Sequence, residues 1–217
     1  MQNTNAALEQ MLSQQVRTWD VFDARTLDAM RRVPRECFVP PAWGSLAYAD
    51  CALPLGLGKH MLTPMLAGRM LQALAVRQGE QVLEIGTGSG YLSACLAAIG
   101  GRVQSLELHG AIAAAARANL RQAGVDSVEV TTADGAALVS ETAYDAIVLT
   151  ASLPVYQPRF ERALKHGGRL FVVVGGGAVM EARLVRRRGP TGFSSEALFE
   201  TCLEALENVP QPPSFAF

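Results

Sequence analysis

The residues best suited to chemistry in this sequence surround a short glycine-rich loop. Three glycines alternate with polar residues in Gly86-Thr87-Gly88-Ser89-Gly90, between an apolar stretch and a stretch with helical spacing. Closely spaced glycines let the backbone approach a ligand and leave N–H groups free to bind it. Where a strand leads into a helix, such a loop predicts a ligand site at the carboxyl edge of a parallel sheet.

The spacing of the loop separates several kinds of nucleotide site. A dinucleotide fingerprint requires its third glycine at position 91, which is Tyr91 here. A phosphate-binding P-loop would continue with Gly-Lys-Ser or Gly-Lys-Thr, which this sequence does not do. The loop therefore disfavours a nicotinamide-dependent oxidoreductase.

Acidic residues follow the loop at the ends of the next two predicted strands. Glu107 lies 17 residues after Gly90, where a carboxylate takes both ribose hydroxyls in nucleotide-binding folds. Asp134 and Gly135 follow the third strand, within reach of an adenine amino group. An adenosine site without a basic phosphate clamp suits S-adenosylmethionine better than NAD or ATP. Glu84, just before the loop, is expected either to bind nearby backbone or to contact the methionine end of that cofactor.

Composition excludes several broad classes of protein. The 217 residues are 49% hydrophobic and 18% charged, which excludes a largely disordered chain. A formal net charge of −1 argues against a nucleic-acid partner. No apolar run approaches the roughly 20 residues of a membrane span, and the polar first residues do not resemble a signal peptide. We expect a cytoplasmic protein that binds no membrane.

Cysteine and histidine usage argues against a metal site. The four cysteines are far apart and form no Cys-x-x-Cys pair, and the chain has only three histidines. This spacing does not suit a metal cluster, and free thiols are the simplest expectation.

The apolar pattern predicts the elements that position these residues. From residue 80, short apolar stretches alternate with helical ones, which indicates βαβ units and a mainly parallel sheet with helices on both faces. We expect strands at 81–85, 103–108, 128–132, 146–150 and 169–174, and helices at 91–99, 111–123 and 159–164. Two further stretches, 180–187 and 195–203, predict an antiparallel hairpin at one sheet edge, followed by an extended tail at 210–213.

The N-terminal region predicts a helical cap. Apolar spacing indicates helices at 6–18 and 24–33. We expect Trp19, Phe22 and Trp43 to pack inside the cap rather than to stack on a substrate. A proline-rich segment then runs to Lys59 and is expected to be irregular and mostly extended. Thr63 and Pro64 are well suited to begin a helix.

We divide this single expected domain, 1–217, into three parts. These are a cap with a substrate loop (1–78), a cofactor-binding core (79–177) and a hairpin with its tail (178–217).

Several motifs resemble the protein-L-isoaspartate O-methyltransferase family over roughly residues 25–175. They are Leu27-Asp28-Ala29-Met30-Arg31-Arg32-Val33-Pro34-Arg35 with Phe38-Val39-Pro40, Ala47-Tyr48 with Leu53-Pro54-Leu55-Gly56-Leu57-Gly58, the strand and loop 82–91, Asp134-Gly135, Tyr144-Asp145 through Thr150-Ala151, and residues 164–170. The glycine loop is shared by most class I methyltransferases, whereas the Arg-Arg-Val-Pro and Leu-Pro-Leu-Gly segments are more specific.

The resemblance implies a Rossmann-like class I methyltransferase that uses S-adenosylmethionine. Members of this family methylate the α-carboxylate of L-isoaspartyl residues in aged proteins, and the ester then closes to a succinimide. We assign cofactor contacts to Glu84, Gly86, Thr87, Gly88, Ser89, Gly90, Tyr91, Glu107, Leu108, Asp134, Gly135 and Thr150. The expected partners are isoaspartyl proteins or peptides, or another acceptor, and the expected state is a monomer or weak homodimer.

The segment before the third predicted helix departs from the family pattern. The family typically has Gln-Thr-Ile-Ser-x-Pro after its glycine turn, and its serine contacts the substrate. Aligned on Gly58 and Pro64, this chain places Leu62 at the serine and His60 at the threonine.

We assign the substrate loop to Lys59, Met61 and Leu62, and candidate catalytic polar atoms to Thr63 and His60. An acceptor carboxylate with a pKa of about 4 is already ionised at neutral pH and requires no general base. Because leucine cannot donate a hydrogen bond, two alternatives stay open: a methyltransferase for another acceptor, and a non-catalytic protein that binds S-adenosylmethionine.

Overall fold

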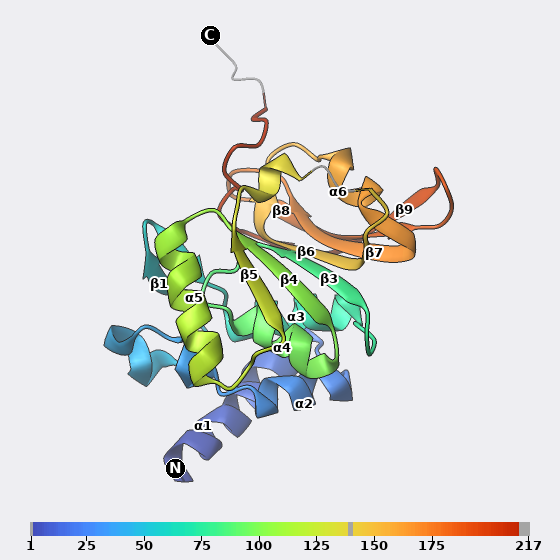
Figure 1. The fold of residues 1–217 in the computed structure, drawn as a ribbon. Helices are drawn as coiled ribbons and strands as arrows, with labels where there is room; N and C mark the ends of the chain where they lie inside the picture. Colours follow the sequence, from blue (N-terminus) through green and yellow to red (C-terminus); the bar gives the residue numbers. More distant parts are fainter. Residues whose placement is uncertain (1, 139–140, 213–217) are drawn as a thin grey trace.

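One large twisted sheet organises the molecule (Figure 1). The computed structural model describes residues 2–138 and 141–212. Seven strands lie in the order β5-β4-β3-β6-β7-β8-β9, of which the first five are parallel and the last two antiparallel. They are β3 (Gln81–Ile85), β4 (Arg102–Glu107), β5 (Val128–Thr132), β6 (Tyr144–Leu153), β7 (Leu164–Val174), β8 (Met180–Arg187) and β9 (Phe193–Thr201). The predicted parallel sheet and its edge hairpin are confirmed.

The central strands are buried on both faces. Val82 and Leu83 of β3 are fully buried, although successive side chains of a strand point to opposite faces. Helices on both faces of a parallel sheet account for such continuous apolar strands. Because β3 pairs with β4 on one side and β6 on the other, the connections after these strands meet at one sheet edge.

Helices cover the two faces unequally. The helices α3 (Pro64–Leu74), α4 (Tyr91–Ile99) and α5 (Gly110–Gln122) contribute to an apolar core on one face. The short helix α6 (Pro158–Arg162) buries Phe160 in a second core, near the 3-10 turn η5 (Gly135–Ala137). The expected helix at 159–164 is shorter in the structure because β7 already begins at Leu164.

The N-terminal cap is helical, as predicted, but its first helix does not stay α-helical to its end. The helix α1 (Gln2–Met11) continues into a π-helical turn, η1 (Leu12–Val16), and a 3-10 turn, η2 (Arg17–Trp19). The helix α2 (Ala24–Arg32) begins after Asp23, whose carboxylate accepts N–H groups of its first turn.

The prediction that three aromatic residues of the cap are packed inside it was wrong. Trp19, Phe22 and Trp43 are 42%, 62% and 39% exposed. Helical spacing places apolar residues on a face, but it does not say whether another element covers that face.

The proline-rich segment is more ordered than the irregular path we expected. It forms two 3-10 turns, η3 (Arg35–Phe38) and η4 (Pro41–Leu46), and then a small antiparallel hairpin. That hairpin pairs β1 (Leu53–Gly56) with β2 (Lys59–Met61). Its turn places Gly56, Leu57 and Gly58 at positive φ, a conformation that glycine adopts without strain.

The chain turns back over the sheet after β9. Residues 202–209, which we call the strap, run beside the carboxyl end of β6, where Ser152 pairs with Ala205. The Ser152 N–H donates to the Glu204 carbonyl and the Leu206 N–H to the Ser152 carbonyl, each at 2.8 Å. Residues 210–212 have no regular secondary structure, and Pro213 of the predicted tail lies outside the described residues. In the described part of the chain, no helix is long and apolar enough to cross a membrane.

Candidate active site

A cavity of about 650 Å³ opens at the carboxyl edge of the parallel strands. Its walls come from the glycine loop, the ends of β4 and β6, the β1–β2 hairpin, the first turns of α3, and the strap. We call the part bordered by Glu107 and Asp134 the cofactor end, after the role predicted for these two residues from the sequence. We call the part bordered by Trp19, Arg69 and Phe199 the acceptor end, as a name for the region left for a second molecule.

The glycine loop forms the floor of the cofactor end. Gly86 has φ +93°, and a Cβ atom there would lie 2.2 Å from the Thr150 hydroxyl oxygen. That hydroxyl donates to the carbonyls of Gly86 at 2.6 Å and Ile85 at 3.1 Å. Only glycine fits this position, because a side chain would displace the hydroxyl that holds the loop against β6.

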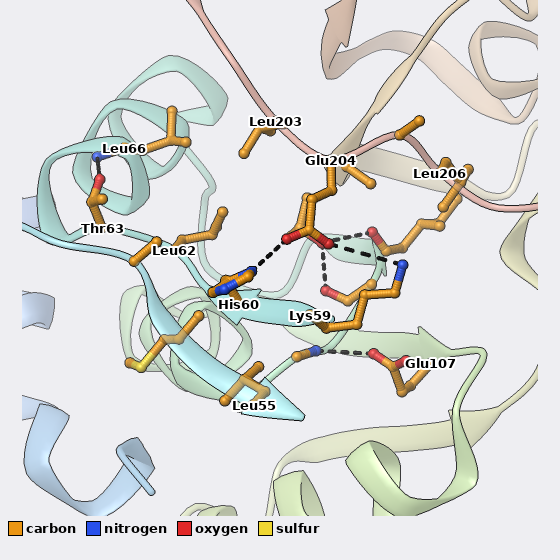
Figure 2. Close-up of a pocket in the computed structure, with 18 of the residues that line it drawn as sticks. Leu55, Lys59, His60, Leu62, Thr63, Leu66, Glu107, Leu203, Glu204 and Leu206 are labelled. Atoms are coloured by element: carbon orange, nitrogen blue, oxygen red, sulfur yellow. Dashed lines mark hydrogen bonds and ion pairs between the residues drawn. The ribbon is translucent and has the colours of Figure 1, made fainter. Parts of the chain in front are cut away.

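Glu107 is the main polar group of the cofactor end. Its two carboxylate oxygens accept the backbone N–H groups of Gly88 at 3.0 Å and His109 at 3.1 Å. Figure 2 shows Glu107 beside the first of these groups, below the strap. A carboxylate oxygen has a second lone pair, so both oxygens can also accept hydroxyl groups. Two fixed acceptors on one buried side chain suit a vicinal diol such as a ribose.

Asp134 borders the same end after β5. One of its oxygens caps η5 by accepting the Ala136 N–H at 2.8 Å, and the other accepts the Asn208 side-chain amide at 3.0 Å. Because Asn208 belongs to the strap, which covers the cavity as a roof, this bond links the strap to the wall at Asp134. Gly135 packs so tightly against Ile85 that a Cβ atom would lie 2.4 Å from an Ile85 methyl group.

Glu84 lies below the glycine loop and is fully buried. It accepts the hydroxyl groups of Ser93 and Ser105, the latter at 2.7 Å. Its Oε1 atom has no hydrogen-bond partner among the described residues. Burial raises the pKa of Glu84 to about 7, although the two serine hydrogen bonds oppose that shift. We expected Glu84 either to bind nearby backbone or to contact the cofactor. Its observed hydrogen bonds are to serine side chains and not to the backbone, and the cofactor contact stays a prediction.

The β1–β2 hairpin and α3 form the wall that leads to the acceptor end. His60, Met61 and Leu62 all border the cavity, and the Met61 side chain is buried. The Thr63 hydroxyl oxygen accepts the Leu66 N–H at 3.4 Å, and Thr63 thereby caps α3 while bordering the cavity.

Buried Arg35 fixes this wall from behind. Its guanidinium donates to the carbonyls of Ala47 at 2.9 Å and Leu62 at 2.7 Å, and lies 4.7 Å from the Tyr91 ring centre. Desolvation by burial lowers the pKa of Arg35 from its usual value. The backbone of Leu62 is therefore held by a residue from the cap.

Ion pairs hold the strap over the cofactor end. Glu204 bonds the His60 Nδ1 atom at 2.5 Å and lies 3.9 Å from the Lys59 Nζ atom. Glu207 bonds Lys59 at 2.7 Å and the His109 Nε2 atom at 2.9 Å. Figure 2 shows Glu204 reaching down from the strap toward His60 and Lys59. Hydrogen bonds from Lys59 and His109 lower the pKa of Glu207.

The structure brings most of the predicted site residues together. Twelve border the large cavity: Lys59, His60, Met61, Leu62, Thr63, Gly86, Gly88, Glu107, Leu108, Asp134, Gly135 and Thr150. Four others, Glu84, Thr87, Ser89 and Tyr91, border a smaller adjoining cavity of about 40 Å³. Gly90 borders neither of these two cavities in the described structure and instead begins α4 at φ +88°.

Sequence reasoning missed the strap and the acceptor end. Glu204 and Glu207 were not singled out, although two acids three residues apart after an apolar strand are a weak signal for ion pairing. Arg69 carried a signal too, because it follows Thr63 and Leu66 at helical spacing. Among the described residues, no group of histidine, cysteine or acidic side chains is arranged to hold a metal ion, and all four cysteines are free thiols.

The sheet, the glycine loop and the cavity together define a class I methyltransferase fold. A solved Plasmodium falciparum structure, described as a putative protein-L-isoaspartate O-methyltransferase in complex with S-adenosyl-L-homocysteine, aligns with a TM-score of 0.78 at 18% identity. The alignment covers 94% of this chain and 98% of that one. The family described as protein-L-isoaspartate(D-aspartate) O-methyltransferase matches residues 5–202, and the chain belongs to it.

Curated relatives agree with this assignment. A protein-L-isoaspartate O-methyltransferase of Methylorubrum populi is 42% identical over 193 residues, which cover 88% of this chain and 91% of the relative. A protein of the same name from Methanoculleus marisnigri is 42% identical over 184 residues, or 83% of each chain. The resemblance found in the sequence motifs is confirmed.

Proposed function

We propose that this protein transfers a methyl group from S-adenosylmethionine to the α-carboxylate of L-isoaspartyl residues in proteins or peptides. The observation that carries the proposal is the family match over residues 5–202, together with a cavity that joins the glycine loop to the β2–α3 wall. The cofactor and acceptor ends meet in this one space, as a direct transfer between two bound molecules requires.

The residues present suit S-adenosylmethionine. Glu107 offers two ordered acceptors for ribose hydroxyls, and Asp134 lies where an adenine amino group would follow. The unpartnered Oε1 atom of Glu84 is a matching acceptor for the ammonium of the methionine end. When bound, this cofactor supplies an electrophilic methyl group on a sulfonium.

The protein's part in the reaction is orientation and exclusion of water. An ionised carboxylate displaces a neutral thioether in line, so no proton moves in the transfer and no general base is needed. The Thr63 hydroxyl and the His60 ring, which both border the cavity, are the groups we predict to orient the acceptor. Orientation and desolvation of this kind contribute several kcal/mol to catalysis.

Leu62 makes the wall more apolar than the family's usual motif, but the comparisons do not favour a different acceptor. Relatives 42% identical over more than four fifths of the chain carry the isoaspartate name. A missing hydrogen-bond donor costs about 1–3 kcal/mol and lowers a rate without abolishing it. We therefore expect slow transfer to isoaspartyl peptides.

Transfer of a tritiated methyl group to a synthetic isoaspartyl peptide tests the proposal. The expected product is a base-labile ester that releases volatile label, formed with the isoaspartyl peptide and not with the same peptide containing ordinary aspartate. Glu107→Ala serves as the control with impaired cofactor binding. Cofactor binding without transfer to any isoaspartyl peptide would contradict the proposed acceptor.

Other expectations stay predictions. They are a cytoplasmic location, a monomer or weak homodimer, the division of one domain into three parts, and the absence of nucleic-acid and membrane partners.

A further inference from the structure

Arg69 occupies an unusual position at the acceptor end of the cavity. It extends from α3, and its guanidinium carbon lies 4.3 Å from the centre of the Phe199 ring. One terminal nitrogen donates to the Trp19 carbonyl at 2.9 Å and to an Asp20 oxygen at 3.3 Å. The Nε atom and the other terminal nitrogen have no hydrogen-bond partner among the described residues.

The charge of Arg69 is only weakly compensated. Its side chain is 16% exposed, whereas the Asp20 side chain is 80% exposed, and an ion pair to so exposed an acid contributes little. The cavity's other described basic residues are Lys59, His60 and His109, and each contacts Glu204 or Glu207. The acceptor end therefore carries positive charge that the cofactor end does not.

The surroundings of Arg69 suit a bound peptide side chain. Trp19 and Phe199 give it apolar, aromatic neighbours that border the same cavity. A guanidinium stacked on an aromatic ring is held in place and keeps its edge free for a carboxylate. Two unpartnered nitrogens on that edge allow bidentate binding, the geometry in which arginine binds a carboxylate or a phosphate, and a peptide side chain offers the carboxylate.

The distance along α3 sets the position of this side chain relative to the reacting carboxylate. Arg69 lies six positions after Thr63, which at 1.5 Å per residue is about 9 Å. An extended peptide spans about 3.3–3.6 Å per residue, so this separation corresponds to two or three peptide residues.

We propose that Arg69, together with Trp19 and Phe199, forms a subsite for an acidic side chain of the acceptor, two or three residues from the isoaspartyl residue. The inference rests on the proposed function and adds a preference for acidic peptides. Asp20 contacts the terminal nitrogen outside the unpartnered edge of the guanidinium, so the incoming carboxylate does not have to displace it.

Three isoaspartyl peptides that differ only at these flanking positions test the subsite. They carry glutamate, glutamine or lysine two and three residues from the isoaspartyl residue, on both sides. Calorimetric titration in the presence of S-adenosylhomocysteine measures their affinities, and tritiated methyl transfer measures kcat and KM. We expect the glutamate peptide to bind about ten-fold more tightly than the glutamine peptide, with the preference in KM and reduced at high salt.

Two variants connect this preference to Arg69. In Arg69→Gln the ratio of the glutamate to the glutamine affinity falls to about one, and because both peptides are measured on the same protein, the ratio does not depend on its folded fraction. Arg121→Gln, an exposed arginine on α5, is the matched control and keeps the wild-type ratio.

Each result is decisive for one of the two hypotheses. Equal binding of the glutamate and glutamine peptides to the wild-type protein, or a preference that survives in Arg69→Gln, overturns the subsite. Absence of methyl transfer to all three peptides overturns the proposed function, while the calorimetric ratio still decides whether the acidic subsite exists.

Discussion

The cofactor and acceptor ends of one cavity are built in different ways. The cofactor end is polar, and Glu107 and Asp134 each accept a backbone N–H from their own or a neighbouring loop. The acceptor end is largely apolar, with one stacked arginine, and is assembled from residues near positions 19, 69 and 199. The first is fixed by hydrogen bonds within adjacent connections, and the second by the packing of distant segments. We therefore expect substitutions at the cofactor end to impair ligand binding more than substitutions at the acceptor end do.

The largest expected effect of a single substitution is at Glu107. Glu107→Ala removes both proposed ribose contacts and weakens binding of S-adenosylmethionine by about 1.5–3 kcal/mol, or roughly 10–150-fold in Kd. Calorimetry measures this change directly. Glu107→Gln, which keeps one oxygen acceptor, is expected to give an intermediate affinity.

Glu129→Ala on the exposed surface of β5 is the matched control for this experiment and is expected to bind as the wild type does. Unchanged affinity in Glu107→Ala would remove Glu107 from the cofactor site. Tighter binding of NAD than of S-adenosylmethionine to the wild-type protein would reject the cofactor itself.

At the acceptor end, Leu62→Ser is expected to raise the rate of isoaspartyl methylation roughly ten-fold or more. The new hydroxyl restores a donor worth about 1–3 kcal/mol at the wall. Steady-state rates on one isoaspartyl peptide measure the change. Leu62→Ala is the control, because it opens the same space without adding a donor.

A competing hypothesis assigns the orienting contact to Thr63. In that case Thr63→Val is the damaging change and Leu62→Ser has no effect. If neither substitution alters the rate of an active enzyme, the segment from Lys59 to Pro64 is not the acceptor wall.

The pH dependence of cofactor binding tests whether the ionised carboxylate of Glu84 contacts the cofactor. Burial raises its pKa to about 7, so the carboxyl is mostly protonated at pH 6 and mostly ionised at pH 8. If only the ionised form accepts the cofactor's ammonium, affinity rises with pH and levels off above 7. We expect binding about ten-fold weaker at pH 6 than at pH 8.

Calorimetric titrations at pH 6, 7 and 8 measure this dependence. Glu84→Gln is the control, because its amide does not titrate in this range, and we expect its profile to be flat. The same rise in both proteins would assign the titration to another group.

Local sequence was sufficient to predict that the glycine loop and Glu107 lie together at one edge of the sheet. The spacing of Gly86, Gly88 and Gly90, with Glu107 at the end of the next strand, follows from how a parallel sheet brings its carboxyl ends together. The N-cap role of Thr63 was equally local, because the Thr-Pro pair satisfies the first turn of a helix.

The acceptor end and the strap could not be predicted from local sequence, because they depend on contacts between segments far apart in the chain. Whether Trp19 is buried depends on which element lies over it, and that element is remote in the chain. Glu204 meets His60 across 144 positions, a pairing that neither residue's neighbours indicate. The β1–β2 hairpin was also missed, because its strands are short and its turn places a leucine at positive φ.

The strap has a consequence for how the protein matures. Domains generally fold as units, and synthesis adds about 5–20 residues per second. The strap follows β9, so the ribosome makes it after every strand of the sheet. Val209, at the end of the strap, belongs to the second apolar core, so neither that core nor the ion pairs of Glu204 and Glu207 with His60, Lys59 and His109 can be complete before the strap is made. The strap therefore completes the second apolar core and the roof of the cofactor cavity together, and it is the last of these parts to be synthesised.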